Sequence, residues 1–182
     1  LYKIVLTNNE GTEGNSMTVL RQAKLNDKVD VVDGGSIVLD FDNDGDLDIC
    51  TFAKEVDGGS LDNHKINIYV WEGQSSDLIA YQTIESSFRG PTIPFCADIN
   101  GDNHPEIIFN TANGMNVLYY DLMAENSMSL KVVPDYKESA AYTAFDFNQD
   151  GKAELVYRGD NNLFLIDGVT LKPLCDSIQA FS

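Results

Sequence analysis

Basic residues are scarce in this sequence. Only 12 Lys and Arg accompany 29 Asp and Glu in 182 residues, so the formal net charge is -17. The basic residues are scattered singly and form no positive patch. A chain of this kind repels nucleic acid and anionic lipid, because nothing in it can neutralise phosphates. We therefore expect no nucleic-acid partner.

Long apolar runs are absent as well. No stretch reaches the about 18 apolar residues that a transmembrane helix needs, so we expect no membrane insertion. The overall apolar content is nevertheless 43%, with 10% aromatic residues. These values are ordinary for a globular protein and argue against disorder.

Residues with obvious catalytic chemistry are few. Cys50, Cys96 and Cys175 are odd in number and lack any metal-type spacing. Cys50 and Cys96 lie in strand-like runs, so we expect small buried side chains rather than a disulfide or a reactive thiol. His64 and His104 are far apart and do not suggest a catalytic pair. No nucleophilic triad order or Gly-rich phosphate loop is present, and we expect a non-catalytic protein.

Eleven of the 29 acidic residues lie in three short loops, at residues 40–48, 98–106 and 146–154. Each loop stands between two apolar runs. The first Asp residues of the loops lie 58 and then 48 positions apart, from 40 to 98 and from 98 to 146. A period near 50 residues is typical of one supersecondary unit per repeat.

Strands are the elements predicted within each repeat. Residues 66–71 alternate with a period of two rather than 3.6, and β-branched and aromatic residues dominate 117–120 and 163–166. Turn residues such as Asn113-Gly114 separate these runs. We expect four strands per unit, which in the first unit lie near 36–41, 47–54, 64–72 and 78–85.

Four antiparallel strands repeated in this way describe a β-propeller blade. The prediction is an all-β chain of about three and a half blades, since an open array exposes strand edges that a closed ring does not. The partial blade covers 1–33, with strands at 2–7 and 17–21, and full blades cover 34–88, 89–138 and 139–182. The chain begins at Leu1 without Met or a signal peptide, so we expect it to continue into further blades of a longer chain.

Calcium is the ion that suits the loops, because it takes six to eight oxygen ligands. Side chains at loop positions 1, 3 and 5 converge, position 6 permits a sharp turn, and position 7 offers its carbonyl. The predicted ligands are Asp40, Asp42, Asp44, the carbonyl of Asp46 and Asp48 in the first loop; Asp98, Asn100, Asp102, the carbonyl of His104 and Glu106 in the second; and Asp146, Asn148, Asp150, the carbonyl of Lys152 and Glu154 in the third.

An EF-hand is excluded, because its position 12 needs a bidentate Glu and these loops carry Thr51, Phe109 or Tyr157 there. Ligation must therefore close at position 9. Asn103 replaces Gly at position 6 of the second loop, and Asn visits positive φ more easily than most residues. We expect up to three Ca²⁺, bound most tightly by the first loop, then the third, then the second. Mg²⁺ is disfavoured because it demands octahedral geometry.

The pattern Asp-x-Asp/Asn-x-Asp-Gly-x-x-Asp/Glu-apolar, set between two strands, resembles the FG-GAP (VCBS-type) repeat over residues 34–182. The Phe-Gly and Gly-Ala-Pro signatures of that family are absent or degraded. The resemblance implies a seven-bladed propeller like those of integrin α chains and bacterial secreted proteins. The run 154–168 is similar to repeats of large Bacteroidetes-type surface proteins, which implies a secreted or cell-surface location.

The leading hypothesis is a calcium-rigidified, non-catalytic module in which a propeller face binds a protein or a glycan, as in adhesion. The alternatives are a lectin or a polysaccharide lyase, because propellers of this kind also occur in such lyases. Trp71 with Tyr69, Tyr119 and Tyr120 could stack on sugars, but packing in the strand core is favoured. The integrin-recognition tripeptide at 158–160 is interpreted as a chance match.

Overall fold

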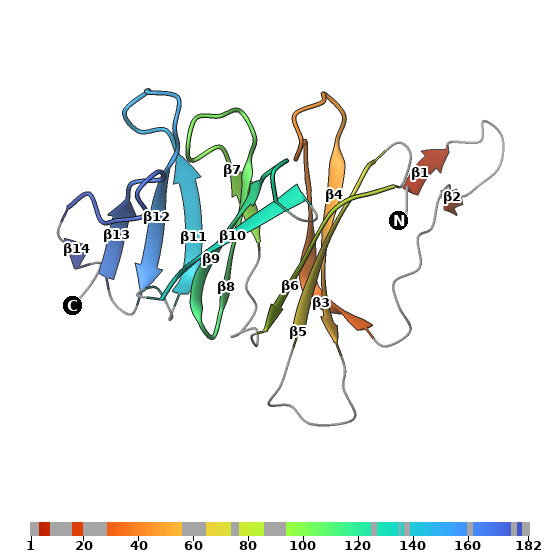
Figure 1. Cartoon of the computed structure of the whole chain (residues 1–182), viewed down its shortest axis with the longest axis horizontal. Coiled ribbons are helices and arrows are strands. Elements are labelled where there is room, and N and C mark those ends of the chain that lie inside the picture. The colour runs from red at the N-terminus through yellow and green to blue at the C-terminus, as the bar shows by residue number, and fades with distance from the viewer. Residues whose placement is uncertain are drawn as a thin grey trace.

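A computed structural model describes residues 4–7, 16–19, 29–55, 65–73, 77–85, 94–124, 127–134, 136, 139–159, 162–175 and 178–179. Within these residues the regular elements are β-strands and no α-helix is present. The strands form one two-stranded hairpin and three four-stranded sheets (Figure 1). The predicted all-β fold with blade-like sheets is confirmed, and the ring is not closed by these sheets.

Each sheet is an antiparallel meander whose strands follow one another in chain order. The hairpin pairs β1 (Ile4–Thr7) with β2 (Ser16–Val19). The three sheets consist of β3 (Val29–Leu39), β4 (Asp48–Glu55), β5 (Lys65–Trp71) and β6 (Leu78–Glu85); β7 (Phe95–Ala97), β8 (Glu106–Thr111), β9 (Gly114–Tyr120) and β10 (Met128–Val133); and β11 (Ser139–Phe145), β12 (Glu154–Gly159), β13 (Asn162–Ile166) and β14 (Ile178–Gln179).

The strands of the first sheet lie close to the predicted ranges, except that β3 begins earlier. Its first residues, Val29 to Val31, pair with Ala53 to Glu55 beyond a β-bulge that precedes Ser36. A bulge of this kind bends a strand without ending it, which the sequence pattern did not indicate. The blade boundaries themselves stay predictions, and the boundary at 88/89 lies outside the described residues.

The second sheet is packed on both faces. On β8, Ile107 and Phe109 belong to a core shared with the first sheet, whereas Ile108 belongs to a core shared with the third. Phe109 meets Phe52 of β4 edge-on, with ring centroids 5.0 Å apart. Burial of each such side chain stabilises the fold by about 1.5–3 kcal/mol. This two-sided burial explains why β8 has a continuous apolar run instead of an alternating one.

Two of the three cysteines take the places expected for small apolar side chains. Cys50 is fully buried between the first and second sheets, and Cys96 is partly buried against the same core. Both are free thiols, as is the exposed Cys175. Burial raises the pKa of the Cys50 thiol far above its usual range, so this thiol does not ionise near neutral pH.

Candidate metal centre

The three acidic loops occupy equivalent places in the three sheets. Each joins the first and second strands of its sheet, and all three lie along the same edge of the sheets, at the top of the view in Figure 1. Their backbones also match: positions 4 and 6 have positive φ in every loop, at Asn43 and Gly45, Gly101 and Asn103, and Gln149 and Gly151.

The positive φ predicted for Asn103 is confirmed, at 68°. The second left-handed residue, at position 4, was missed by sequence reasoning. Asn43 and Gly101 are residue types that adopt this conformation readily and could have signalled it. Gln149 carries no such signal, so the third loop reveals the feature only through its equivalence with the others.

The carboxylate at position 1 holds the turn of each loop. Asp40 accepts hydrogen bonds from the backbone N–H groups of Asp44 and Gly45, both at 3.1 Å. Asp146 accepts the corresponding bonds from Asp150 and Gly151, whereas Asp98 accepts bonds from Gly101 at position 4 and Asn103 at position 6. These charge-assisted bonds arrange the loop backbone around the position-1 side chain.

The carboxylate at position 9 lies beneath the loop, at the start of the second strand. Asp48 accepts a bond from the N–H of Phe41 at 2.8 Å. Glu106 and Glu154 accept the same bond from Ile99 and Phe147, each at 2.9 Å. All three carboxylates are buried. Position 9 therefore faces the loop, as closure of a metal site there requires.

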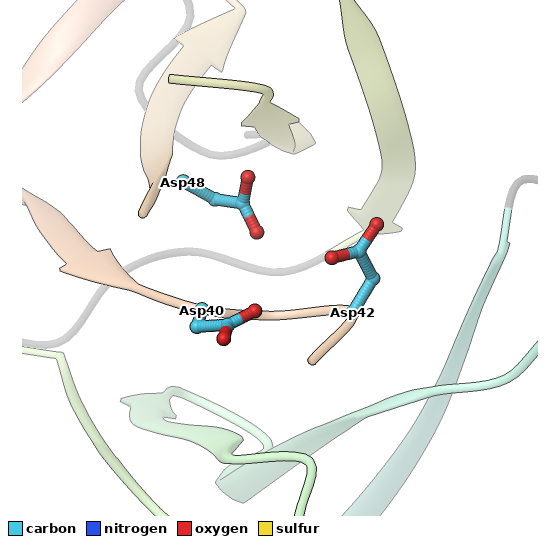
Figure 2. Close-up of side chains that lie close together, drawn as sticks. All are labelled: Asp40, Asp42 and Asp48. Atoms are coloured by element: carbon cyan, nitrogen blue, oxygen red, sulfur yellow. The ribbon is translucent and has the colours of Figure 1, made fainter. Parts of the chain in front are cut away.

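In the first loop three carboxylates converge. One oxygen from each of Asp40, Asp42 and Asp48 lies within 4.8 Å of the other two (Figure 2). Asp42 Oδ1 and Asp48 Oδ1 are buried without a hydrogen-bond partner among the described residues. A buried carboxylate oxygen with no partner is costly, and the group has the hard oxygen donors that a divalent cation needs. This cluster could hold a metal ion.

Ionisation of these carboxyls is unfavourable in the metal-free fold. Burial raises the pKa of Asp48 to about 6, and repulsion from Asp42 and Glu72 adds to the rise. Burial also raises the pKa of Asp42, assisted by the charge of Asp44. A bound cation would reverse this balance, since it favours the charged form.

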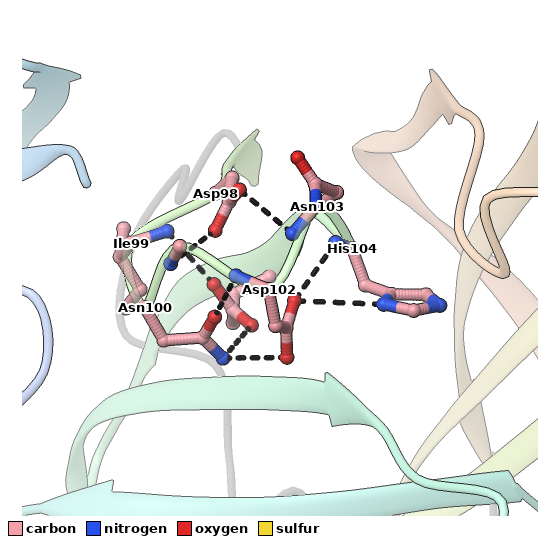
Figure 3. Close-up of polar contacts among 8 residues, drawn as sticks. Asp98, Ile99, Asn100, Asp102, Asn103 and His104 are labelled. Carbon is pink, nitrogen blue, oxygen red and sulfur yellow. Dashed lines mark hydrogen bonds and ion pairs between the residues drawn. The ribbon is translucent and has the colours of Figure 1, made fainter. Parts of the chain in front are cut away.

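In the second and third loops a side-chain amide relieves the same repulsion between carboxylates. Asn100 Nδ2 donates to Asp102 at 2.9 Å and to Glu106 at 2.7 Å, so it bridges two carboxylates (Figure 3). Asn148 makes the same bridge between Asp150 and Glu154, at 3.2 and 2.9 Å. Asp42 occupies this position in the first loop and has no N–H to donate. Within the described residues, the three-carboxylate group is found in the first loop alone.

The remaining predicted ligands lie on the outer turn of the loops. The position-5 carboxylates of Asp44, Asp102 and Asp150 accept bonds from the N–H of position 7, at 2.8–2.9 Å. These position-7 residues are Asp46, His104 and Lys152. The predicted role of their carbonyls stays a prediction. The His104 ring packs against Tyr120, with ring centroids 5.1 Å apart.

The stability of the metal-free chain should fall as pH rises from about 4 to 7. Burial, with repulsion from Asp102 and Asp98, raises the pKa of Glu106 to about 7, and Asp48 titrates near 6. Unfolded carboxyls titrate near pH 4, so between these values the folded state binds more protons and loses stability as they leave. In EDTA we expect a higher melting temperature at pH 5 than at pH 7.5.

A calcium ion held by these loops would show the opposite dependence, because metal binding requires deprotonated carboxylates. The rise in melting temperature on adding calcium is expected to be larger at pH 7.5 than at pH 5. Thermal melts followed by circular dichroism at the two pH values, each in calcium and in EDTA, give both comparisons. A chelated chain that gains stability between pH 5 and 7.5 would contradict this electrostatic account.

The other residues noted in the sequence do not converge on a second site. Tyr119 and Tyr120 pack against the two cores, as predicted, whereas Tyr69 and Trp71 stack on each other on β5, with centroids 6.0 Å apart. Arg158 is exposed on β12. Both His64 and the Asp of the 158–160 tripeptide lie outside the described residues.

Comparison with known proteins identifies the repeat. Residues 40–109, which contain the first two loops and the strands between them, match the FG-GAP-like repeat family model. The chain thus carries an FG-GAP-like repeat folded as blade-like antiparallel sheets, and the resemblance predicted from the loop pattern is confirmed. Searches of curated proteins and of solved structures gave no match. Among the described residues, no helix has the length and apolar character to cross a membrane.

Proposed function

We propose that this chain is a calcium-stabilised, non-catalytic β-propeller module of a secreted or cell-surface protein. The observation that carries the proposal is the convergence of Asp40, Asp42 and Asp48 with two buried, unpartnered oxygens. An all-oxygen donor set favours Ca²⁺ or Mg²⁺ over softer metals. Calcium is the better fit, because an irregular loop rarely supplies the strict octahedron of Mg²⁺.

Calcium would act here as a structural ion. In the first loop Asp40, Asp42 and Asp48 would hold it, and in the other loops the carboxylates at positions 1, 5 and 9 would do so with the Asn at position 3. Because each loop joins two neighbouring strands, the ion would fix the end of a hairpin. Binding to the folded state alone stabilises that state, by about 2.7 kcal/mol at a calcium concentration of 100 times Kd.

The proposed partner is a protein or a glycan bound on a propeller face, with further sheets completing the ring. The repeat supports this architecture, although a fold alone does not identify a ligand. The charge of -17 favours a neutral glycan or a basic protein surface. Release of products from acidic or neutral polysaccharides would contradict the non-catalytic assignment.

Calcium titration of the metal-free chain tests the central part of this proposal. Isothermal titration calorimetry is expected to show saturable binding, with the first loop filled first. The matched titration with magnesium should show much weaker binding. Heats no larger than those of dilution with both ions would contradict the proposal.

A further inference from the structure

A glutamate outside the first acidic loop lies beside the buried carboxylate at position 9. Glu72 directly follows β5, and the register of β4 and β5 pairs Ile49 with Trp71. Continued by one residue, this register places Glu72 opposite Asp48. Directly opposed residues of antiparallel strands have their side chains on the same face of the sheet. Glu72 is therefore on the face that carries Asp48.

That face of the first sheet is turned toward the second sheet. Cys50 pairs with Val70, and both side chains are fully buried in the core that the first sheet shares with the second. Side chains alternate along a strand, so Asp48 shares its face with Cys50, and Glu72 shares its face with Val70. Glu72 is partly exposed, which leaves its carboxylate free to respond to an ion.

The backbone at Gly73 holds Glu72 against the loop. A Cβ at Gly73 would overlap the carbonyl oxygen of Leu47, so only glycine lets the chain pass this close to loop position 8. The N–H of Glu72 donates to the carbonyl of Asp77 at 2.8 Å, which closes the hairpin between β5 and β6. Both contacts fix the backbone of Glu72 next to the start of β4.

The charge of Glu72 acts on the two carboxylates that have an unpartnered oxygen. Asp42 Oδ1 and Asp48 Oδ1 are buried without a hydrogen-bond partner among the described residues. Burial is the main cause of the raised pKa of both residues, and the negative charge of Glu72 adds to the rise at each. A further carboxylate at this place destabilises the metal-free cluster and would stabilise the same cluster around a cation.

The other two sheets lack such a carboxylate at the equivalent place. By the same register, Tyr119 takes the place of Glu72 beside the second loop and Asp167 takes it beside the third. Burial raises the pKa of Tyr119 to about 12, and the charge of Glu106 adds to the rise, which agrees with a place next to position 9. Asp167 is bound to its own turn, because its Oδ1 accepts bonds from Thr170 N and Oγ1 at 2.6 and 2.7 Å.

We propose that the Glu72 carboxylate is a ligand, supplied from outside the loop, of a calcium ion held by Asp40, Asp42 and Asp48. The inference rests on the calcium site proposed above for the first loop. A glutamate side chain is long and flexible, so its carboxylate can turn toward an ion that replaces repulsion by attraction. A further charged ligand raises calcium affinity. The ion would then hold the end of β5 as well as the ends of β3 and β4.

Calcium titration of Glu72→Gln by isothermal titration calorimetry tests the proposal. We expect the tightest site to bind calcium about tenfold or more weakly than in the wild type, with the weaker sites unchanged. Asp77→Asn is the matched control, because it removes one charge from the same hairpin at an exposed side chain, and salt screens such a charge. The control should keep wild-type affinity. In EDTA, urea unfolding should show Glu72→Gln to be at least as stable as the wild type, since it removes a repelling charge.

Terbium luminescence distinguishes a ligand from a nearby charge. Tb³⁺ takes the same oxygen ligands as Ca²⁺, and it can be excited through Trp71, the single Trp of the chain and the neighbour of Glu72. Its decay rates in H₂O and D₂O report the water molecules bound to the ion. Tb³⁺ excited through Trp71 should carry an additional water molecule in Glu72→Gln.

Two failures can be told apart in these experiments. A wild type that binds no calcium would overturn this inference together with the proposed function. A wild type that binds calcium, with the same affinity at the tightest site or the same number of bound waters in Glu72→Gln, would overturn this inference alone.

Discussion

The variant Asp48→Asn is expected to be less stable than the wild type in calcium and at least as stable in EDTA. In calcium the variant loses the charge of one metal ligand. It can therefore lose the stabilisation of the folded state by bound calcium, which is about 2.7 kcal/mol at a calcium concentration of 100 times Kd. In EDTA the neutral amide removes a buried carboxylate whose pKa is raised to about 6. Its carbonyl can still accept the hydrogen bond of Phe41 N.

A loss of stability in calcium without a loss in EDTA distinguishes a metal ligand from a carboxylate with a purely structural role. Were Asp48 needed only for its bond to Phe41, the substitution would have the same effect on stability in calcium and in EDTA. Asp46→Asn is the matched control, because it removes one charge from the same loop at a position predicted to bind through its carbonyl. Urea unfolding of the three chains in calcium and in EDTA measures the difference. An equal loss for Asp48→Asn in both conditions would contradict a metal role for this residue.

The second large effect is expected for Gly168→Ala, which should destabilise the fold by about 3 kcal/mol. Its Cβ would lie 2.4 Å from the carbonyl oxygens of both Ala153 and Ile99. These are backbone atoms of two different loops, so neither can give way without disturbing the bond from Ala153 to Asp98. Overpacking against rigid backbone is among the costlier single changes.

A loss of this size lowers the melting temperature by roughly 6–12 °C for a chain of this length. Gly151→Ala is the control, because a Cβ there has no atom within 4 Å. It carries only the strain of a non-Gly residue at a φ of 86°, about 1 kcal/mol. Thermal melts of both variants in EDTA remove any contribution from metal. Equal losses for the two would show that the approach of the second loop to Gly168 does not stabilise the fold.

The strands and the loop positions could be predicted from the sequence because both depend on local pattern. Residues 66–71 alternate along β5, and the polar nine-residue segments interrupt the apolar runs where the chain turns. Burial depends instead on the neighbouring sheet. Phe41 and Phe147 occupy the same motif position, yet only Phe41 is covered, and no local pattern distinguishes them.

The candidate site likewise has some features that the sequence predicts and others that depend on the three-dimensional structure. The loop pattern identified the acidic positions and the turn at Asn103, but treated Asp42, Asn100 and Asn148 as interchangeable oxygen donors. The structure separates them, because an amide can bridge two carboxylates and Asp42 cannot. That difference makes the first loop the strongest candidate for a metal centre. The predicted order of calcium affinity among the three loops stays a prediction.

Calcium titration of the metal-free wild-type chain, with Asp48→Asn titrated in parallel, tests the central claim most directly. The wild type should bind up to three ions, and the variant should lose the tightest of them while keeping the weaker ones. Calcium that fails to bind the wild type, or that binds both chains with the same stoichiometry and affinity, would contradict a calcium centre formed by Asp40, Asp42 and Asp48.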